Sequence, residues 1–172
     1  LIRHTPYAIY GHSMGAWIGF ELIRALRRLH RPLPVHFFAA ARRAPHLPAT
    51  LPPLGGLPDS AFLAGMQERY GGIPKVLLED PEIMRIFLPA LKGDVQLLDA
   101  FAYVEEAPLP VPFTVIGGTQ DDRTRPDELR AWKAHTSEAF RVRQIDGGHF
   151  FLKERRAEVT ALITATLASD GR

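Results

Sequence analysis

Hydrophobic residues follow two kinds of pattern along the 172-residue chain. Short apolar runs, typical of buried strands, occupy three segments, at residues 7–10, 35–40 and 113–116. A fourth segment, residues 140–145, alternates apolar and polar side chains, as a half-exposed strand does. Apolar residues at helical spacing occupy three further segments, at residues 14–30, 126–136 and 156–167. This alternation of strands and helices predicts an α/β fold with a mostly parallel sheet flanked by helices.

A block between the second and third predicted strands interrupts the alternation. Residues 42–58 are rich in proline, leucine and glycine, and helical patterns follow at residues 60–70, 75–79, 81–92 and 94–104. Pro81 suits the first turn of a helix, with Asp80 as its cap. We expect one domain over residues 1–172, with an inserted helical lid at about residues 53–106. The alternative is a set of ordinary helices packed on the sheet.

The stretch Gly11-His12-Ser13-Met14-Gly15 lies between the first predicted strand and the first predicted helix. It matches G-x-S-x-G, a pattern in which a serine occupies a strained turn between strand and helix. Glycines two positions before and after the serine let the strand and the helix approach closely. The alternative is a glycine-rich loop that happens to contain a serine. The flanking strand and helix favour the interpretation of Ser13 as a nucleophile.

Two further polar residues follow the carboxyl ends of later predicted strands. Asp121 comes shortly after the third strand, and His149 comes shortly after the fourth. Sites in open parallel sheets form at this edge, so we expect both side chains to meet Ser13 there. The order serine, aspartate, histidine resembles that of α/β-hydrolases and predicts their fold.

The chemistry assigns a role to each group. A serine hydroxyl is a weak nucleophile until a base takes its proton, and His149 is placed to be that base. An acid behind the imidazole fixes its tautomer, and we favour Asp121 over its neighbour Asp122 for this role. The backbone N–H of Met14 is expected to donate to the oxyanion that forms after attack by Ser13.

Other charged and titratable residues have structural or surface interpretations. We interpret five histidines in this way: His4, His12, His36, His46 and His135. The first predicted helix ends in a basic group formed by Arg24, Arg27, Arg28 and Arg31. This group is either a solvated face or a dock for an acidic partner.

Several stretches resemble the type II thioesterases, the stand-alone editing enzymes of polyketide and nonribosomal peptide biosynthesis. The resemblance lies in Gly11-His12-Ser13-Met14-Gly15-Ala16, in Trp132 with His135-Thr136, and in Gly147-Gly148-His149-Phe150-Phe151-Leu152. The lid stretch Leu88-Pro89-Ala90-Leu91-Lys92-Gly93-Asp94 and Pro112 also fit the family pattern. One departure is Thr124, near which the family usually has an apolar residue.

The resemblance implies a function and a partner. Such enzymes hydrolyse acyl thioesters from the phosphopantetheine arm of acyl or peptidyl carrier proteins, which clears stalled or wrongly primed chains. By residue match, Ser13 is the nucleophile, Asp121 the acid and His149 the base. Two other functions stay open: a carboxylesterase or lipase of oxygen esters, and a truncated, non-catalytic chain that only binds a carrier protein.

Composition excludes some classes of partner. The 21 Lys and Arg nearly balance the 19 Asp and Glu, which argues against a nucleic-acid partner. Without cysteine the chain has neither disulfides nor a thiol nucleophile. No apolar run has the length of a membrane span, so we expect no membrane partner and a cytoplasmic location. We also expect no cofactor, no metal and a monomer when the protein is full length.

The predicted serine strand begins close to Leu1. In an α/β-hydrolase, the loop after an earlier strand supplies the second oxyanion amide. We therefore expect the N-terminal strands of the domain to be missing from this chain. The serine strand, normally central, would then lie at an unpaired sheet edge.

Overall fold

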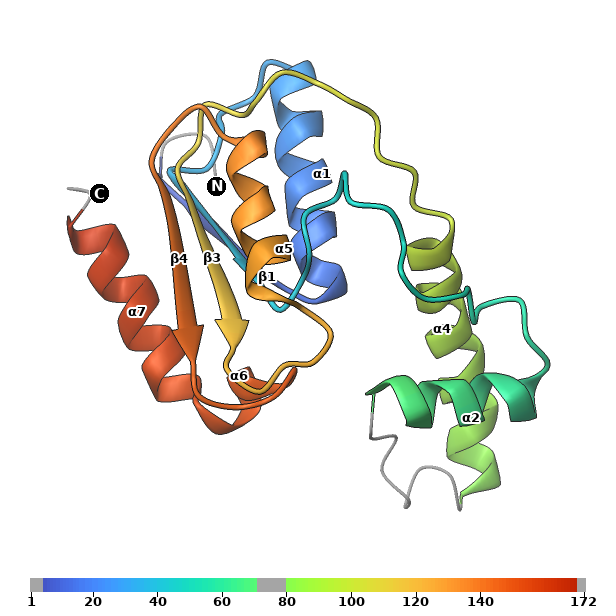
Figure 1. Cartoon of the computed structure of the whole chain (residues 1–172). Coiled ribbons are helices and arrows are strands. Elements are labelled where there is room, and N and C mark those ends of the chain that lie inside the picture. The colour runs from blue at the N-terminus through green and yellow to red at the C-terminus, as the bar shows by residue number, and fades with distance from the viewer. Residues whose placement is uncertain (1–4, 71–79, 170–172) are drawn as a thin grey trace. The chain divides into compact units, whose positions relative to one another are not determined.

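The computed structural model describes residues 5–70 and 80–169, which fall into two compact units (Figure 1). Unit 1 consists of Leu1–Leu47 and Val104–Arg172, and unit 2 consists of Pro48–Tyr103. The helix predicted at residues 75–79 and the side chain of His4 lie outside the described residues.

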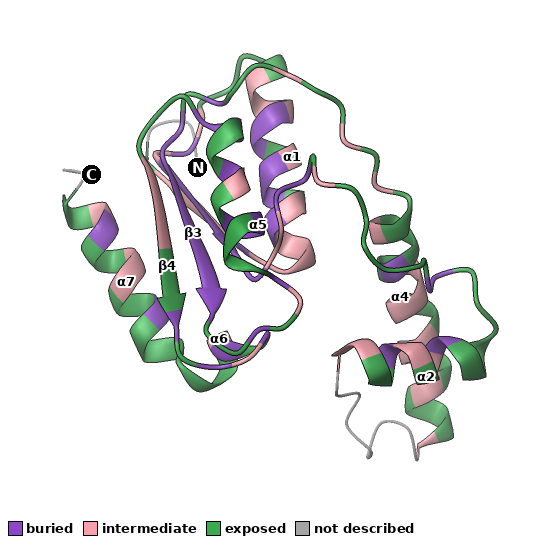
Figure 2. Cartoon of the chain, viewed as in Figure 1, coloured by how far each residue is buried: buried purple, intermediate pink, exposed green. Residues whose placement is uncertain are grey.

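Unit 1 contains a four-stranded parallel sheet with the order β1-β2-β3-β4. The strands are β1 (Ala8–His12), β2 (His36–Ala40), β3 (Phe113–Gly118) and β4 (Phe140–Ile145). Figure 2 shows β3 buried along its length, whereas β4 has exposed positions toward its carboxyl end. This difference agrees with the mostly apolar sequence of β3 and the alternating sequence of β4. The predicted α/β fold with a parallel sheet is confirmed.

Helices cover both faces of the sheet (Figure 1). One face carries α1 (Met14–Arg28), α5 (Pro126–Arg130) and the 3₁₀ helix η1 (Ala131–His135), and the other carries α6 (Phe151–Glu154) and α7 (Arg156–Ser169). Consecutive strand residues point to opposite faces, so Phe37 packs against Trp132 whereas Phe38 packs with Phe151 and Val159. Two hydrophobic layers therefore enclose the sheet. Among the described helices, none combines the length and the hydrophobicity that crossing a bilayer requires.

The helix predicted at residues 126–136 is wrong in its second half, which is the 3₁₀ helix η1 rather than a continuation of α5. In a 3₁₀ turn, side chains three residues apart lie above one another. This geometry lets Leu129, Trp132 and His135 all face the interior, where each is at most 5% exposed. Core packing thus decides the helix type here.

Unit 2 is built from α2 (Asp59–Tyr70) and α4 (Pro81–Asp99). The prediction of two helices over residues 81–104 is wrong, because α4 continues through Gly93. The apolar face of α4 stays in register across that glycine, since Leu88, Leu91 and Val95 all pack in one hydrophobic cluster with α2. The predicted cap is confirmed, because the Asp80 carboxylate accepts hydrogen bonds from the N–H groups of Glu82 and Ile83.

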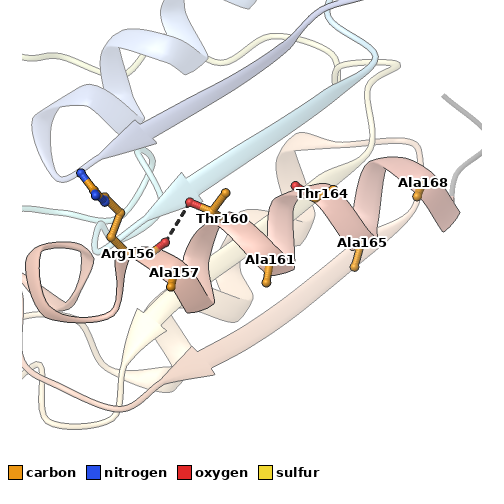
Figure 3. Close-up of a pocket in the computed structure, with 7 residues that line it drawn as sticks. All are labelled: Arg156, Ala157, Thr160, Ala161, Thr164, Ala165 and Ala168. Carbon is orange, nitrogen blue, oxygen red and sulfur yellow. Dashed lines mark hydrogen bonds between the residues drawn. The ribbon is translucent and has the colours of Figure 1, made fainter.

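A shallow hollow runs along α7 (Figure 3). Its lining consists of Arg156, Ala157, Thr160, Ala161, Thr164, Ala165 and Ala168. Small side chains leave this surface open, and the Thr160 hydroxyl turns back to donate to the carbonyl of Arg156 at 2.8 Å. The hollow contains none of the residues that the sequence assigns to catalysis.

The basic end of α1 forms ion pairs with an acidic residue of the same chain. The Glu106 carboxylate accepts ion pairs from Arg24 and Arg27, each at 2.6 Å, and from Arg28 at 2.5 Å. Arg24 is only 2% exposed and also pairs with Glu21. The expectation of a solvated face is therefore wrong for the buried Arg24, whereas Arg27 and Arg28 remain 25% and 53% exposed. All three arginines bind the segment that follows unit 2, and the dock for an acidic partner stays a prediction.

Replacing Glu106 with Gln is expected to lower the free energy of unfolding by about 1–3 kcal/mol at neutral pH, because the buried Arg24 guanidinium loses a charged acceptor. Burial raises the pKa of Glu106, but hydrogen bonds and charges from the three arginines outweigh it and lower the pKa from 4.5 to about 2. The ion pairs therefore stabilise fully above about pH 4.5, and the stabilisation is lost as the pH falls toward 2. Urea denaturation at neutral and at acidic pH measures both effects.

Glu105→Gln is the matched control, since it removes the same charge from the exposed neighbouring position. It is expected to change the free energy of unfolding by less than about 0.5 kcal/mol. Equal effects of the two substitutions, or a Glu106→Gln effect that grows on acidification, would contradict the assignment.

Candidate active site

The predicted nucleophile lies in a tight turn between β1 and α1. Ser13 has φ 54° and ψ −117°, and its N–H donates to the carbonyl of Ala40 at 2.8 Å. A positive φ is strained for a residue with a side chain, at a cost of about 1–3 kcal/mol. A Cβ at Gly11 would lie 2.1 Å from the carbonyl oxygen of Gly15, so β1 and α1 meet at a distance that only glycine permits.

The turns after β3 and β4 are joined by their backbones. Thr119 donates its N–H to the carbonyl of Ile145, and Gln120 donates to that of Gly147, both at 2.9 Å. A Cβ at Gly118 would lie 2.5 Å from the carbonyl oxygen of Gly147, so this approach also requires a glycine. The two turns therefore hold the predicted acid and the predicted base side by side.

The three predicted side chains lie within hydrogen-bonding distance of one another. His149 Nε2 is 3.0 Å from Ser13 Oγ, and His149 Nδ1 is 3.0 Å from Asp121 Oδ2. The side chains of His149 and Asp121 are only 5% and 0% exposed. With its proton on Nδ1, a neutral imidazole donates to the carboxylate and accepts from the hydroxyl. The arrangement can transfer the serine proton to the ring.

Asp121, rather than Asp122, faces the imidazole. Its Oδ2 also accepts a hydrogen bond from the Thr124 hydroxyl at 2.6 Å, and its Oδ1 accepts one from the Arg123 N–H at 3.1 Å. Burial raises the pKa of Asp121, but hydrogen bonds from His149, Thr124 and Arg123 outweigh it and lower the pKa below its ordinary value. The Asp122 side chain is 91% exposed and lies 4.0 Å from Arg123.

The predicted oxyanion donor belongs to the first turn of α1. The helix begins at Met14, directly after the serine. Backbone N–H groups in a first helical turn have no carbonyl partner within the helix, and the positive end of the helix dipole lies there. The position of Met14 suits a donor to negative charge, and its catalytic role stays a prediction.

Sequence reasoning missed one contact at this site. It interpreted His12 as a packed residue, and the ring does contact the Phe151 ring at 5.2 Å between centroids. In addition, His12 Nε2 lies 2.8 Å from the carbonyl oxygen of His149. These two residues are 137 positions apart, and no pattern along the chain signals such a pair.

The other described histidines among the five are placed away from the triad. The His36 ring is buried and bonds to the Thr114 hydroxyl at 2.9 Å, whereas His46 Nδ1 lies 2.6 Å from His135 Nε2. Burial, with the charges of His46 and Arg24, lowers the pKa of His135 to about 4. Within the described ranges, no three His, Cys, Asp or Glu side chains are grouped so that they could hold a metal ion.

Comparison with known proteins identifies the family. Residues 1–167 match the model of the thioesterase domain. The chain is 41% identical over 169 residues to linear gramicidin dehydrogenase LgrE of Brevibacillus parabrevis, covering 96% of this chain and 64% of that protein. It is 37% identical over 156 residues to gramicidin S biosynthesis protein GrsT of Aneurinibacillus migulanus, covering 91% of this chain and 60% of that protein. The chain therefore spans less than two thirds of the length of either relative.

Solved structures agree. ClbQ from the colibactin NRPS/PKS pathway superposes with a TM-score of 0.88 at 29% identity, over 96% of this chain and 70% of ClbQ. The type II thioesterase BorB of the borrelidin cluster gives a TM-score of 0.80 at 30% identity, over 96% of this chain and 64% of BorB. The resemblance to type II thioesterases is confirmed, and the chain belongs to the thioesterase domain family of the α/β-hydrolases.

Proposed function

We propose that the chain is the catalytic part of a serine thioesterase that releases acyl groups from the phosphopantetheine arm of acyl or peptidyl carrier proteins. The observation that carries this proposal is the pair of 3.0 Å contacts that links Ser13 Oγ through His149 to Asp121. Family membership supports the thioester as the bond that is cleaved. The biosynthetic pathways named for GrsT and BorB support carrier proteins of nonribosomal peptide and polyketide synthesis as partners.

In the first half of the proposed reaction, Ser13 Oγ attacks the thioester carbonyl carbon while His149 Nε2 takes the hydroxyl proton. The negative charge that develops on the carbonyl oxygen is stabilised by the N–H of Met14 and the amino end of α1. The tetrahedral intermediate collapses by breaking its carbon–sulfur bond. His149 gives its proton to the departing sulfur, so the carrier arm leaves as a thiol and the acyl group stays on Ser13.

In the second half, water replaces the thiol. His149 takes a proton from water, and the resulting hydroxide attacks the acyl carbon of the ester on Ser13. Collapse breaks the bond to Ser13 Oγ, which recovers its proton from His149, and the free acid leaves. Throughout, the Asp121 carboxylate accepts a hydrogen bond from the Nδ1–H group of His149 and stabilises the imidazolium. Its buried, deprotonated carboxylate suits this role.

We propose that unit 2 is the lid of this enzyme. It is compact by itself, with Leu54, Phe62, Met66 and Val95 in its own hydrophobic cluster. Its helix α4 also carries exposed apolar side chains, of which Ile86 is 74% exposed. Such side chains suit contact with an acyl chain, because burying apolar surface is favourable without directional bonds.

The proposal is tested by comparing three substrates with the same acyl group: a carrier-protein thioester, a pantetheine thioester and a p-nitrophenyl ester. We expect kcat/KM to be highest for the carrier-protein thioester. Preference for the oxygen ester by tenfold or more would instead favour an esterase. A fluorophosphonate probe labels Ser13 independently of the acyl substrate, and failure of the wild-type chain to react would favour a non-catalytic, carrier-binding role.

A further inference from the structure

Two consecutive residues at the end of β1 contact opposite ends of His149. Ser13 Oγ lies 3.0 Å from Nε2 of the imidazole, and His12 Nε2 lies 2.8 Å from the main-chain oxygen of the same histidine. The His12 ring nitrogen carries the proton in the second contact, because a carbonyl oxygen can only accept. The base is therefore held both at its ring and at its backbone by one strand end.

This double contact matters because of the sheet order. β1 and β4 occupy opposite edges of the described sheet, with β2 and β3 between them. Three strand spacings separate them by about 14 Å, so no ladder hydrogen bond fixes Ser13 relative to the turn that carries His149. The turn after β4 nevertheless brings the main chain of His149 within 2.8 Å of His12 Nε2, beside the nucleophile.

The surroundings of His12 favour a neutral ring, whose Nε2–H group can donate to the carbonyl of His149. Its ring stacks on Phe150 at 6.4 Å and meets Phe151 edge-on at 5.2 Å between centroids. The Tyr10 hydroxyl lies 3.4 Å from Nδ1 and can donate to it when Nε2 carries the proton of a neutral ring. Burial and the nearby His149 lower the pKa of His12, so the ring stays neutral at physiological pH.

We propose that His12 is a positioning residue, whose hydrogen bond to the His149 carbonyl sets the distance between the imidazole and Ser13 Oγ. The inference rests on the serine chemistry proposed above. A displacement of the base by about 1 Å can slow a reaction about 100-fold, so loss of this bond is expected to reduce reactivity without removing any reacting atom.

Two variants separate the hydrogen bond from the packing of the ring. His12→Phe keeps an aromatic ring against Phe150 and Phe151 but has no donor, whereas His12→Gln keeps an N–H donor of similar reach but has no ring. The readout is the rate at which a fluorophosphonate labels Ser13 in the full chain, with thermal unfolding measured alongside. We expect His12→Phe to label about 10- to 100-fold more slowly, and His12→Gln to label within about threefold of the wild-type rate.

A second measurement does not depend on any reaction. The His149 Nδ1 proton, bonded to Asp121, gives a downfield NMR resonance that is expected to persist in His12→Gln and to broaden or disappear in His12→Phe. A folded His12→Phe variant with wild-type labelling and resonance would overturn the inference, and so would equal slowing by both variants. If thioesters are not hydrolysed but labelling follows the expected order, the proposed substrate is wrong and the role of His12 stands.

Discussion

Replacing Ser13 with Ala is expected to lower kcat for thioester hydrolysis by about 10⁶-fold. The substitution removes the oxygen that lies 3.0 Å from His149 Nε2. Alanine keeps the backbone N–H that donates to the carbonyl of Ala40 in the turn. Binding of the proposed carrier-protein partner is expected to persist, because the fold of unit 1 does not depend on this hydroxyl. Release of free thiol from an acyl pantetheine thioester, followed by a colorimetric thiol reagent, measures the loss.

Ser137→Ala is the matched control. Its hydroxyl donates to the carbonyl of Leu109 at 3.4 Å, and it has no contact with the triad in the described part of the chain. We expect wild-type turnover from this variant. If Ser13→Ala retained more than about a tenth of the wild-type rate, another group would have to be the nucleophile, and the chemistry proposed for this site would be wrong.

The sheet was predictable because its burial is regular. β2 and β3 are buried on both faces and are mostly apolar, each with one buried polar residue (His36 and Thr114), and β4 is half-exposed and alternates. The helix boundaries were less predictable, since they depend on contacts between segments. Gly93 suggests a break in the sequence, but packing of Val95 with Phe62 keeps α4 continuous. A glycine inside a helix costs about 1 kcal/mol relative to alanine, and burial of apolar side chains such as Val95 outweighs that cost.

The identity of the site residues was predictable from type and order, and their contacts were not. Ser13 and His149 follow strands, as the parallel sheet requires, and the glycines beside them permit the close turns. The bonds that shape the site join residues far apart in sequence, such as His12 with His149. Thr124 illustrates the same limit: it departs from the family pattern, yet its hydroxyl donates to the Asp121 carboxylate at 2.6 Å.

The arginines of α1 show how the structure changes a functional interpretation. As a sequence, Arg24, Arg27 and Arg28 form a basic patch suited to an acidic carrier protein. In the fold, one acceptor 78 to 82 positions along the chain neutralises part of this charge, and Arg24 is buried. Internal ion pairs with Glu106 therefore account for much of the basic charge at this end of α1.

Replacing Asp121 with Asn is expected to lower kcat about 10⁴-fold while the protein stays folded. An amide at this position no longer offers the charge that stabilises the imidazolium. It also presents an N–H group toward His149, which favours the wrong tautomer of the ring. Steady-state hydrolysis of a pantetheine thioester measures the effect, with KM expected to change little because Asp121 contacts the base and not the acyl group.

Asp122→Asn removes the same charge one position away and is the matched control. Its side chain is 91% exposed, so we expect turnover within about twofold of the wild-type value. Asp121 and Asp122 have the same side chain and differ only in the direction in which the turn after β3 places it. A large loss with Asp122→Asn and a small one with Asp121→Asn would mean that this turn rearranges before the reaction, and that the 3.0 Å contact with His149 is not the catalytic one.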